Sequence, residues 1–214
     1  MLSALVFVLA LTRPVHVTLR SNAAATFPLV SRFGVITIDL YPRGFRAKSV
    51  WLRGFAINGQ NTLTVENPIS RMYTRMPMSG IGDIARFIGG KPVNIGPPRN
   101  VVVTSGSVGK LPARRYRIVY SANDYVDVWT TAAGPPAPAF RACVDELVRV
   151  IAPQSALLLR RIPDTPLFVE LNIGPYRKVA LLQVAAVAHS SAGEADALRV
   201  SPWMFPAPFG TIFK

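Results

Sequence analysis

The feature that most constrains the fold is the run from Phe45 to Met78, FRAKSVWLRGFAINGQNTLTVENPISRMYTRMPM. In this run, short apolar and β-branched segments alternate with turn signals, which is typical of consecutive strands. Asn58-Gly59 predicts a tight hairpin turn, because both central residues of such a turn need positive φ and Asn-Gly tolerates it. Gly54 is expected to end the first strand. The three strands expected here are 45–52, 62–66 and 71–76.

The same alternation continues on both sides of this run, which predicts ten or eleven strands in meander order. Strands joined by short turns are antiparallel neighbours, and so long a sheet must curl or close. Half of the 214 residues are hydrophobic and 16% are charged, as in a globular chain. We therefore expect one mainly β domain over 15–214, an α+β fold with a curled antiparallel sheet or incomplete barrel. The other strands are expected at 15–21, 33–41, 101–105, 111–120, 125–131, 167–171, 177–188 and 197–200.

The helices are expected in the connections between strands. The segment 139–151 has an apolar stripe at helical spacing, while Asp145, Glu146 and Arg149 lie off it. We expect this helix to dock on the concave side of the sheet or to cap a rim. Shorter helices are expected at 79–88 and 154–161. The stripe consists of Phe140, Val144, Leu147, Val148 and Ile151.

The first residues raise the question of export. Leu2 to Leu11, LSALVFVLAL, is too short to span a bilayer but has the length of a signal-peptide core. No Lys or Arg precedes it, and no small-x-small cleavage site follows at once. Residues 1–14 are thus predicted to be a signal peptide or, alternatively, a buried first segment. The signal peptide would place the protein in the periplasm or outside the cell.

The net charge of +13 leaves two classes of anionic partner to weigh, nucleic acid and a membrane surface. The dense basic groups lie in or beside predicted strands and helices, where part of each group faces solvent. The chain has no basic tail and no nucleic-acid-binding motif. We expect no nucleic-acid partner, and an anionic membrane surface remains a possible partner of the Arg residues. The basic groups are 114–117, 160–161 and 177–178.

The residues that usually carry catalysis or bind metals are scarce. His16 and His189 have no partner at metal-binding spacing, and Gly106 to Lys110 lacks the spacing of a phosphate loop. No nucleophile-elbow motif occurs. We expect no catalytic residue, no metal and no cofactor, although counting alone leaves open an unrecognised Ser-His-Asp hydrolase. Cys143 lies on the helix stripe and is expected to be a buried, unreactive thiol. The eleven acids are expected to pair with the surplus Arg.

Large apolar side chains on the predicted strands and main helix are the remaining candidates for function. Each one by itself is expected in an ordinary core. As a set they fit a second interpretation, in which a curled sheet with a helix across its mouth leaves an apolar cavity for an acyl chain. Strand register would decide which of them face inward. The candidates are Trp51, Met72, Tyr73, Met76, Trp129, Phe140, Val144 and Leu147, and Phe168 belongs to the same apolar surplus.

Four segments together resemble the outer-membrane lipoprotein-carrier superfamily and its uncharacterised relatives. VENPISRMYT (65–74) resembles a strand, an Asn-Pro turn and a Tyr-bearing strand. LPARRYRIVYSANDYVDVWTT (111–131) is similar to a hairpin that precedes Pro-rich sequence and a helix. IPDTPLFVEL (162–171) resembles the strand before the last hairpin, and the tail 200–214 loosely matches the closing motif through Phe205, Pro208 and Gly210.

This resemblance implies an open β-barrel that holds a helix and an apolar cavity, and carriage of lipid or lipoprotein acyl chains across a cell envelope. No functional residue of the family maps onto a position here. The favoured hypothesis is a non-enzymatic envelope protein that binds a lipid-like ligand. The alternative is a structural or partner-binding envelope protein of the same fold with no ligand cavity.

Overall fold

The computed structural model describes residues 16–22, 35–87, 96–174, 176–190 and 192–212. Within them, twelve strands form one sheet in the order β12-β6-β5-β4-β3-β2-β1-β11-β10-β9-β8-β7. The strands are β1 (His16–Ser21), β2 (Ile36–Tyr41), β3 (Gly44–Lys48), β4 (Arg53–Ile57), β5 (Thr62–Asn67), β6 (Met72–Pro77), β7 (Asn100–Val108), β8 (Leu111–Val119), β9 (Tyr125–Thr131), β10 (Thr165–Ile173), β11 (Tyr176–Ala188) and β12 (Phe205–Pro206).

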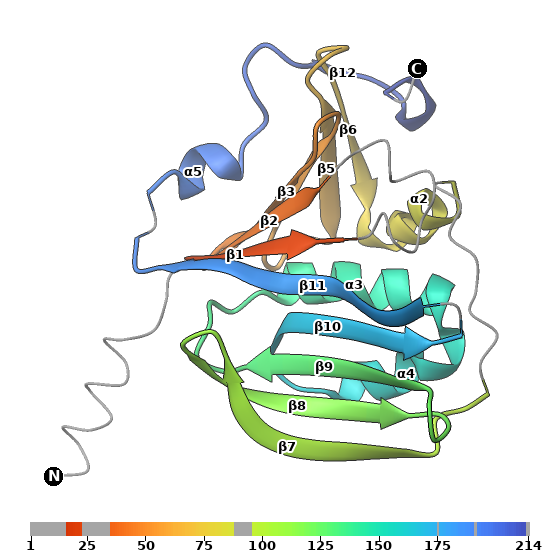
Figure 1. Ribbon diagram of the computed structural model, residues 1–214. Coiled ribbons are helices and arrows are strands. Elements are labelled where there is room, and N and C mark those ends of the chain that lie inside the picture. Colours follow the sequence, from red (N-terminus) through yellow and green to blue (C-terminus); the bar gives the residue numbers. More distant parts are fainter. Residues whose placement is uncertain (1–15, 23–34, 88–95, 175, 191, 213–214) are drawn as a thin grey trace, which may run out of the picture.

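The sheet consists of two meanders that meet at β1. Strand β1 pairs with β2 on one side and with β11 on the other, so it joins strands β2–β6 to strands β7–β11. All pairs are antiparallel except β12 with β6, which is parallel. The sheet stays open, with β12 and β7 at its edges, and β2–β6 rise away from the plane of β1 and β7–β11 (Figure 1). The mainly β, curled and open sheet confirms the predicted fold class.

Two consecutive helices cover one face of the sheet. Helix α3 (Pro138–Ile151) and helix α4 (Pro153–Arg161) lie behind β8–β11, with α2 (Ile81–Phe87) near one end of α3 (Figure 1). The N-terminal part of α3 enters the main core, where the rings of Phe140 and Phe45 meet edge to face at 5.6 Å. The stripe residues Phe140, Val144, Leu147 and Val148 therefore face the sheet, as in the first of the two expected placements; the side chain of Ile151 lies outside the described part of the chain.

The opposite face of β2–β5 is covered by the C-terminal segment. Helix α5 (Glu194–Ala197) and Leu198 pack against Tyr41 and Phe55. The strand predicted at 197–200 is therefore wrong, because its apolar side chains are buried against the sheet from a helical turn instead. Gly193 precedes this helix at φ 81°, and the Glu194 carboxylate accepts a hydrogen bond of 2.8 Å from the Arg43 backbone N–H. The last strand, β12, lies in the Pro-rich tail.

The run 45–78 holds four strands, not three. The expected strand 45–52 ends at Lys48, and a turn at 49–52 leads into β4. Gly54 lies inside β4, paired with Ala47 and Val65, because neighbouring strands on both sides supply its backbone hydrogen bonds. The expected end of a strand at Gly54 is thus wrong. Short turns and antiparallel neighbours are confirmed throughout this run.

The Asn58-Gly59 turn differs from the expected type. Gly59 has φ 83°, whereas Asn58 does not have positive φ. The Asn58 side chain instead donates a 2.9 Å hydrogen bond to the Pro42 carbonyl and accepts one of 3.2 Å from the Ala139 N–H. A residue that the sequence marks as a turn former thus also fixes the start of α3.

The expected helix at 79–88 begins with a 3-10 turn, η3 (Met78–Gly80), and continues as α2. Ile88 and residues 1–14 lie outside the described residues, as does the first residue of the expected 15–21 strand. A short 3-10 helix, η4 (Phe209–Thr211), closes the described chain. No helix in the described part of the chain has the length and apolarity needed to cross a membrane.

Candidate ligand-binding site

An apolar cavity of about 90 Å³ lies between the helix pair α3–α4 and the inner face of β9–β11. Apolar side chains make up nearly all of its exposed wall. The helices contribute one wall and the strands the other. The lining residues are Tyr120, Val126, Val128, Arg141, Val144, Asp145, Val148, Ala152, Ser155, Leu159, Ile162, Pro166, Val169, Leu171, Ile173 and Leu181.

Strand alternation explains why the sheet wall is apolar. Val126 and Val128 point inward from β9, where they oppose Leu171 and Val169 of β10. The residue between them, Asp127, points to the other face. Because directly paired residues share a face, the cavity wall extends across three strands as a patch of β-branched and Leu side chains.

The polar groups that reach this cavity satisfy each other. The Tyr120 hydroxyl, just beyond β8, is hydrogen-bonded to the buried Ser155 hydroxyl of α4. Burial raises the pKa of Tyr120, which keeps its phenol protonated at neutral pH. This contact ties α4 to the end of β8 and leaves little polar surface exposed inside the cavity.

A cleft of about 460 Å³ with both polar and apolar walls adjoins the cavity, and Arg141, Asp145 and Ile162 line both. Arg141 approaches Asp145 at 3.4 Å and donates to the carbonyls of Asp164, at 2.9 Å, and Leu159. The hydrogen bonds of the Arg141 guanidinium are therefore already made to groups of the same chain. Arg160 and Asp164 also line the cleft and are at least partly exposed. The two hollows therefore lie side by side, one apolar and one lined in part by charged side chains.

The structure brings few of the predicted ligand-binding residues to this cavity. Of the eight candidates, Val144 lines it. Phe140 is buried in the main core, and Leu147, Met72 and Met76 pack against that core. The remaining three candidates lie elsewhere. They are Trp51, Tyr73 and Trp129.

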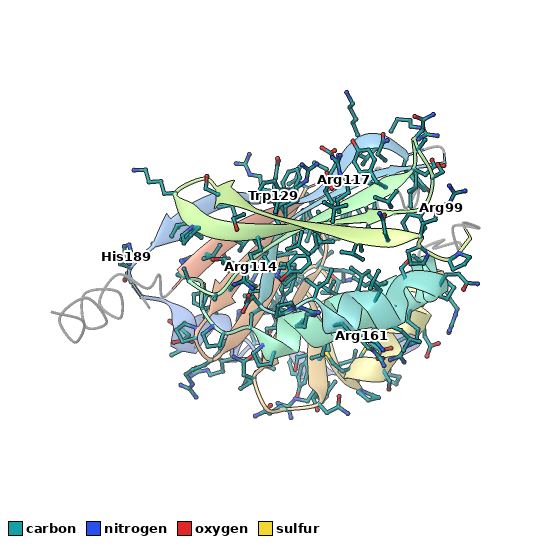
Figure 2. The ribbon with its side chains drawn as sticks, turned by 90° about the horizontal axis from the view of Figure 1, so that it is seen from below. Arg99, Arg114, Arg117, Trp129, Arg161 and His189 are labelled. Atoms are coloured by element: carbon teal, nitrogen blue, oxygen red, sulfur yellow. The ribbon has the colours of Figure 1, made fainter. Side chains whose placement is uncertain are left out.

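Trp51 lies in the turn between β3 and β4 with 46% of its surface exposed, and Tyr73 is half-buried on β6 with the Arg75 guanidinium 5.7 Å from its ring. Trp129 pairs with Arg115 and faces away from the helices. Figure 2 shows it there together with Arg117. The ring lies over Gly106, where an added Cβ would come within 2.8 Å of it.

Sequence reasoning missed most of the cavity wall because it favoured large rings. In YVDVWTT, the aromatic residues Tyr125 and Trp129 alternate with the smaller Val126 and Val128. The smaller pair faces the cavity, and the rings face outward beside Arg117 and Arg115. Strict alternation along β9 was the signal that separates the two sets, but it does not say which set faces the helices.

The two His residues lie in different settings: His189 is exposed just beyond the end of β11 (Figure 2), whereas His16 has polar neighbours. His16 Nε2 lies 3.2 Å from Asp39 Oδ1 and 3.3 Å from Thr18 Oγ1. A nucleophilic triad needs the carboxylate on one ring nitrogen and the hydroxyl on the other, whereas here both partners face the same nitrogen. This cluster is therefore not arranged as a triad. Within the described residues, no group of three metal-ligating side chains occurs.

The other chemical expectations concern the thiol and the acids. Cys143 is buried against Met78, which confirms a core cysteine, and burial raises the pKa of its thiol. Many of the acids pair with basic residues, as expected. The acids in ion pairs with Arg or Lys are Asp39, Glu66, Asp83, Asp124, Asp127, Asp145 and Glu146.

Comparisons with known proteins yield no family for this chain. No family model and no curated protein matches it. A solved structure of an uncharacterized conserved protein from Thermus thermophilus is similar, with 9% identity and a TM-score of 0.46. The match covers 97% of this chain and 99% of that one. A similarity at this level says nothing about function.

Proposed function

We propose that this protein binds a lipid-like amphiphile without catalysing a reaction. The observation that carries the proposal is the apolar cavity between α3–α4 and the sheet, which adjoins a charged cleft. The acyl chain would occupy the cavity and the head group the cleft. Burial of a chain is favourable by about 0.8 kcal/mol per methylene, so a few methylenes give measurable affinity.

The proposal requires the helix pair to move. A volume of about 90 Å³ is well below the roughly 300–1,000 Å³ of typical ligand pockets. Helix α3 is held near its first turn by Asn58 and Phe140, whereas its later turns and α4 border the cavity. In the proposed mechanism, α4 and the end of α3 separate from β9–β11 to admit the chain, and the first turn of α3 stays in place.

The proposed head group is anionic. Arg160 lines the cleft at the end of α4 and makes no ion pair within the described residues. It is thus available to a carboxylate or phosphate, unlike Arg141, which is bound to Asp145 and two carbonyls. Because Arg160 is exposed to solvent, it would contribute modestly to affinity and mainly orient the ligand.

The proposed setting is the cell envelope, periplasmic or secreted, and the chain would be a relative of the lipoprotein carriers. The support is the apolar segment 2–11 and the sequence motifs at 65–74 and 111–131. An anionic membrane, contacted through Arg side chains, is the proposed source of the ligand. These assignments are independent of the cavity and would be tested by locating the native protein in fractionated cells.

The binding test uses a fluorescent long-chain fatty acid, together with mass spectrometry of lipids extracted from the purified protein. We expect co-purified or exchangeable lipid. Val148→Phe fills the cavity and should weaken fatty-acid binding by about tenfold, since losing two buried methylenes costs about 1.6 kcal/mol. Arg160→Ala should weaken binding of the fatty acid about two- to fivefold, and leave binding of the uncharged alcohol of the same length unchanged.

Leu157→Phe is the matched control, because Leu157 lies on α4 but is 72% exposed and does not line the cavity. It should bind like the wild type. A protein that neither retains nor takes up lipid, or a Val148→Phe variant that binds as well as wild type, would contradict the proposal. The small cavity volume favours one alternative, a partner-binding protein of the same fold without a ligand, and the first of these results would support it.

A further inference from the structure

The two edges of the sheet differ in how they are protected from pairing with another chain. Strand β12 has two residues, Phe205 and Pro206, and Pro208 follows closely. A short edge that contains Pro offers few backbone groups for hydrogen bonding. This edge is therefore blocked.

Strand β7 has none of these protections. It has nine residues, NVVVTSGSV, with no charge and no Pro, and all nine pair with β8 on one side. Among the described residues its other side is the end of the sheet, and Figure 2 looks onto it with no labelled strand or helix in front. Residues 102–107 are all exposed, and Val103 has 54% of its surface exposed. A long, uncharged, β-branched edge of this kind presents a row of unpaired N–H and C=O groups to another strand.

We propose that β7 pairs antiparallel with β7 of a second copy, so that two sheets become one continuous sheet across a two-fold axis. A two-fold interface requires a surface that complements itself. A strand without charged residues complements itself in antiparallel orientation, because no side chain meets a like charge within the overlap. Full overlap of the nine residues centres on Thr104, which then lies opposite Thr104 of the second copy.

In this register, a side chain of the second copy lies opposite Gly106, which has no side chain of its own. Val102 of the second copy lies opposite Gly106, on the face where the Trp129 ring covers that glycine. The valine would therefore pack against the edge of the indole and bury two apolar groups that are partly exposed in a single copy.

The chain's positive charge does not oppose this pairing strongly. The nearest arginine-rich strand is β8, where Arg115 and Arg117 are both paired with Asp127, while Arg114 is exposed and makes no ion pair within the described residues. In the dimer the two β8 strands are separated by three strand spacings, about 14 Å. This exceeds the Debye length of about 8 Å at physiological salt. Just outside the overlap, Arg99 of one copy lies beside Lys110 of the other, so repulsion is confined to the two ends of the paired strands and moderate salt is the appropriate condition for a test.

The test measures mass by sedimentation as a function of concentration. We expect wild type to associate reversibly to twice its chain mass of 23.3 kDa. Thr104→Lys places two cations opposite each other at the centre and should give a monomer with unchanged circular dichroism. Phe205→Lys, the matched charge at the other edge, should remain dimeric.

Cross-linking tests the register. Thr104→Cys should form an intermolecular disulfide under mild oxidation, because directly opposed residues have Cα atoms about 4.5–5.5 Å apart. Ser107→Cys should not, since two copies of residue 107 lie about 20 Å apart in this register. The wild-type protein, whose buried Cys143 is a free thiol, gives the background level of intermolecular disulfide formation. A monomer at all concentrations, or a dimer that Thr104→Lys leaves intact, would overturn the proposal. Lipid binding measured on Thr104→Lys keeps this outcome separate from the proposed function.

Discussion

The two halves of the sheet bury their surfaces differently. Strands β2–β5 are covered on both faces, by α3 on one and by the C-terminal segment on the other. Strands β8–β10 are covered by α3 and α4 on one face, where the cavity lies, and carry Arg115, Arg117 and Trp129 on the other. One half of the sheet is therefore packed on both faces, whereas the other half has a single helix layer with a cavity beneath it.

A buried ion pair lies in the half that is packed on both faces. Arg46 donates 2.7 Å hydrogen bonds to the Glu66 carboxylate and to the Ala197 carbonyl, and Glu66 is fully buried. Glu66 also accepts a 3.3 Å hydrogen bond from the Ser201 N–H. Strands β3 and β5 and the C-terminal segment are therefore all linked through the Glu66 carboxylate. Loss of this carboxylate should destabilise this half of the sheet more than loss of any exposed ion pair.

The largest expected effect follows from removing that carboxylate charge. Glu66→Gln should lower the free energy of unfolding by about 3–5 kcal/mol, because it leaves the Arg46 guanidinium buried without a counter-charge. Denaturant unfolding measures the change. Asp83→Asn breaks the exposed pair with Arg86 and should have almost no effect. Equal effects of the two substitutions would show that the buried pair does not stabilise this half of the sheet.

The second effect concerns acid stability of the same half. Burial by itself raises the pKa of the Asp39 carboxyl, but hydrogen bonds from Thr18, at 2.8 Å, and Lys48, at 3.1 Å, outweigh it and leave the pKa below its ordinary value. A lowered folded-state pKa stabilises the protein above the unfolded pKa of about 3.9, and this contribution is lost as pH falls through the folded value.

Asp39→Asn should therefore destabilise the protein by about 1.5–3 kcal/mol at neutral pH. The difference from wild type should shrink as pH falls below about 4. Unfolding curves across pH provide the measurement. Asp196→Asn, at an exposed acid of α5, should leave the pH dependence unchanged. A difference that stays constant down to low pH would mean that the Asp39 charge is not responsible.

The smallest expected effect concerns the half of the sheet that contains the cavity. Val148→Ile adds one methylene to the cavity and should raise the free energy of unfolding by about 0.8 kcal/mol. The same change at Val35, which is 64% exposed, should be nearly neutral. Thermal unfolding of both variants is sufficient. A destabilised Val148→Ile variant would show that the helix layer is already tightly packed against β9–β11.

Much of the architecture could be predicted from local signals. Turn residues and β-branched alternation predicted most strands, and the stripe on 139–151 predicted α3 and its docking side. Errors arose where partners distant in sequence supply what local signals lack. Gly54 stays in a strand because β3 and β5 flank it, and 197–200 is not a strand because Tyr41 and Phe55 bury Ala197 and Leu198.

The candidate site was less predictable. Alternation along β9 separates Val126 and Val128 from Trp129, but the sequence does not say which face meets the helices. Large rings were the favoured candidates for a ligand site, yet Trp129 covers Gly106 on the opposite face. The cleft brings Arg141 and Arg160 together with Asp164, from the two helices and the loop before β10, and no local motif encodes that meeting.

Hydrophobic period and turn chemistry act locally, so the residues alone were sufficient to predict an antiparallel sheet, one strongly amphipathic helix and a buried Cys143. Only the tertiary structure decided which face of each strand points inward, where a cavity remains, and which edge of the sheet is left open. These depend on strand register and on packing between distant segments, and a one-residue shift in register would reverse every inward and outward side chain.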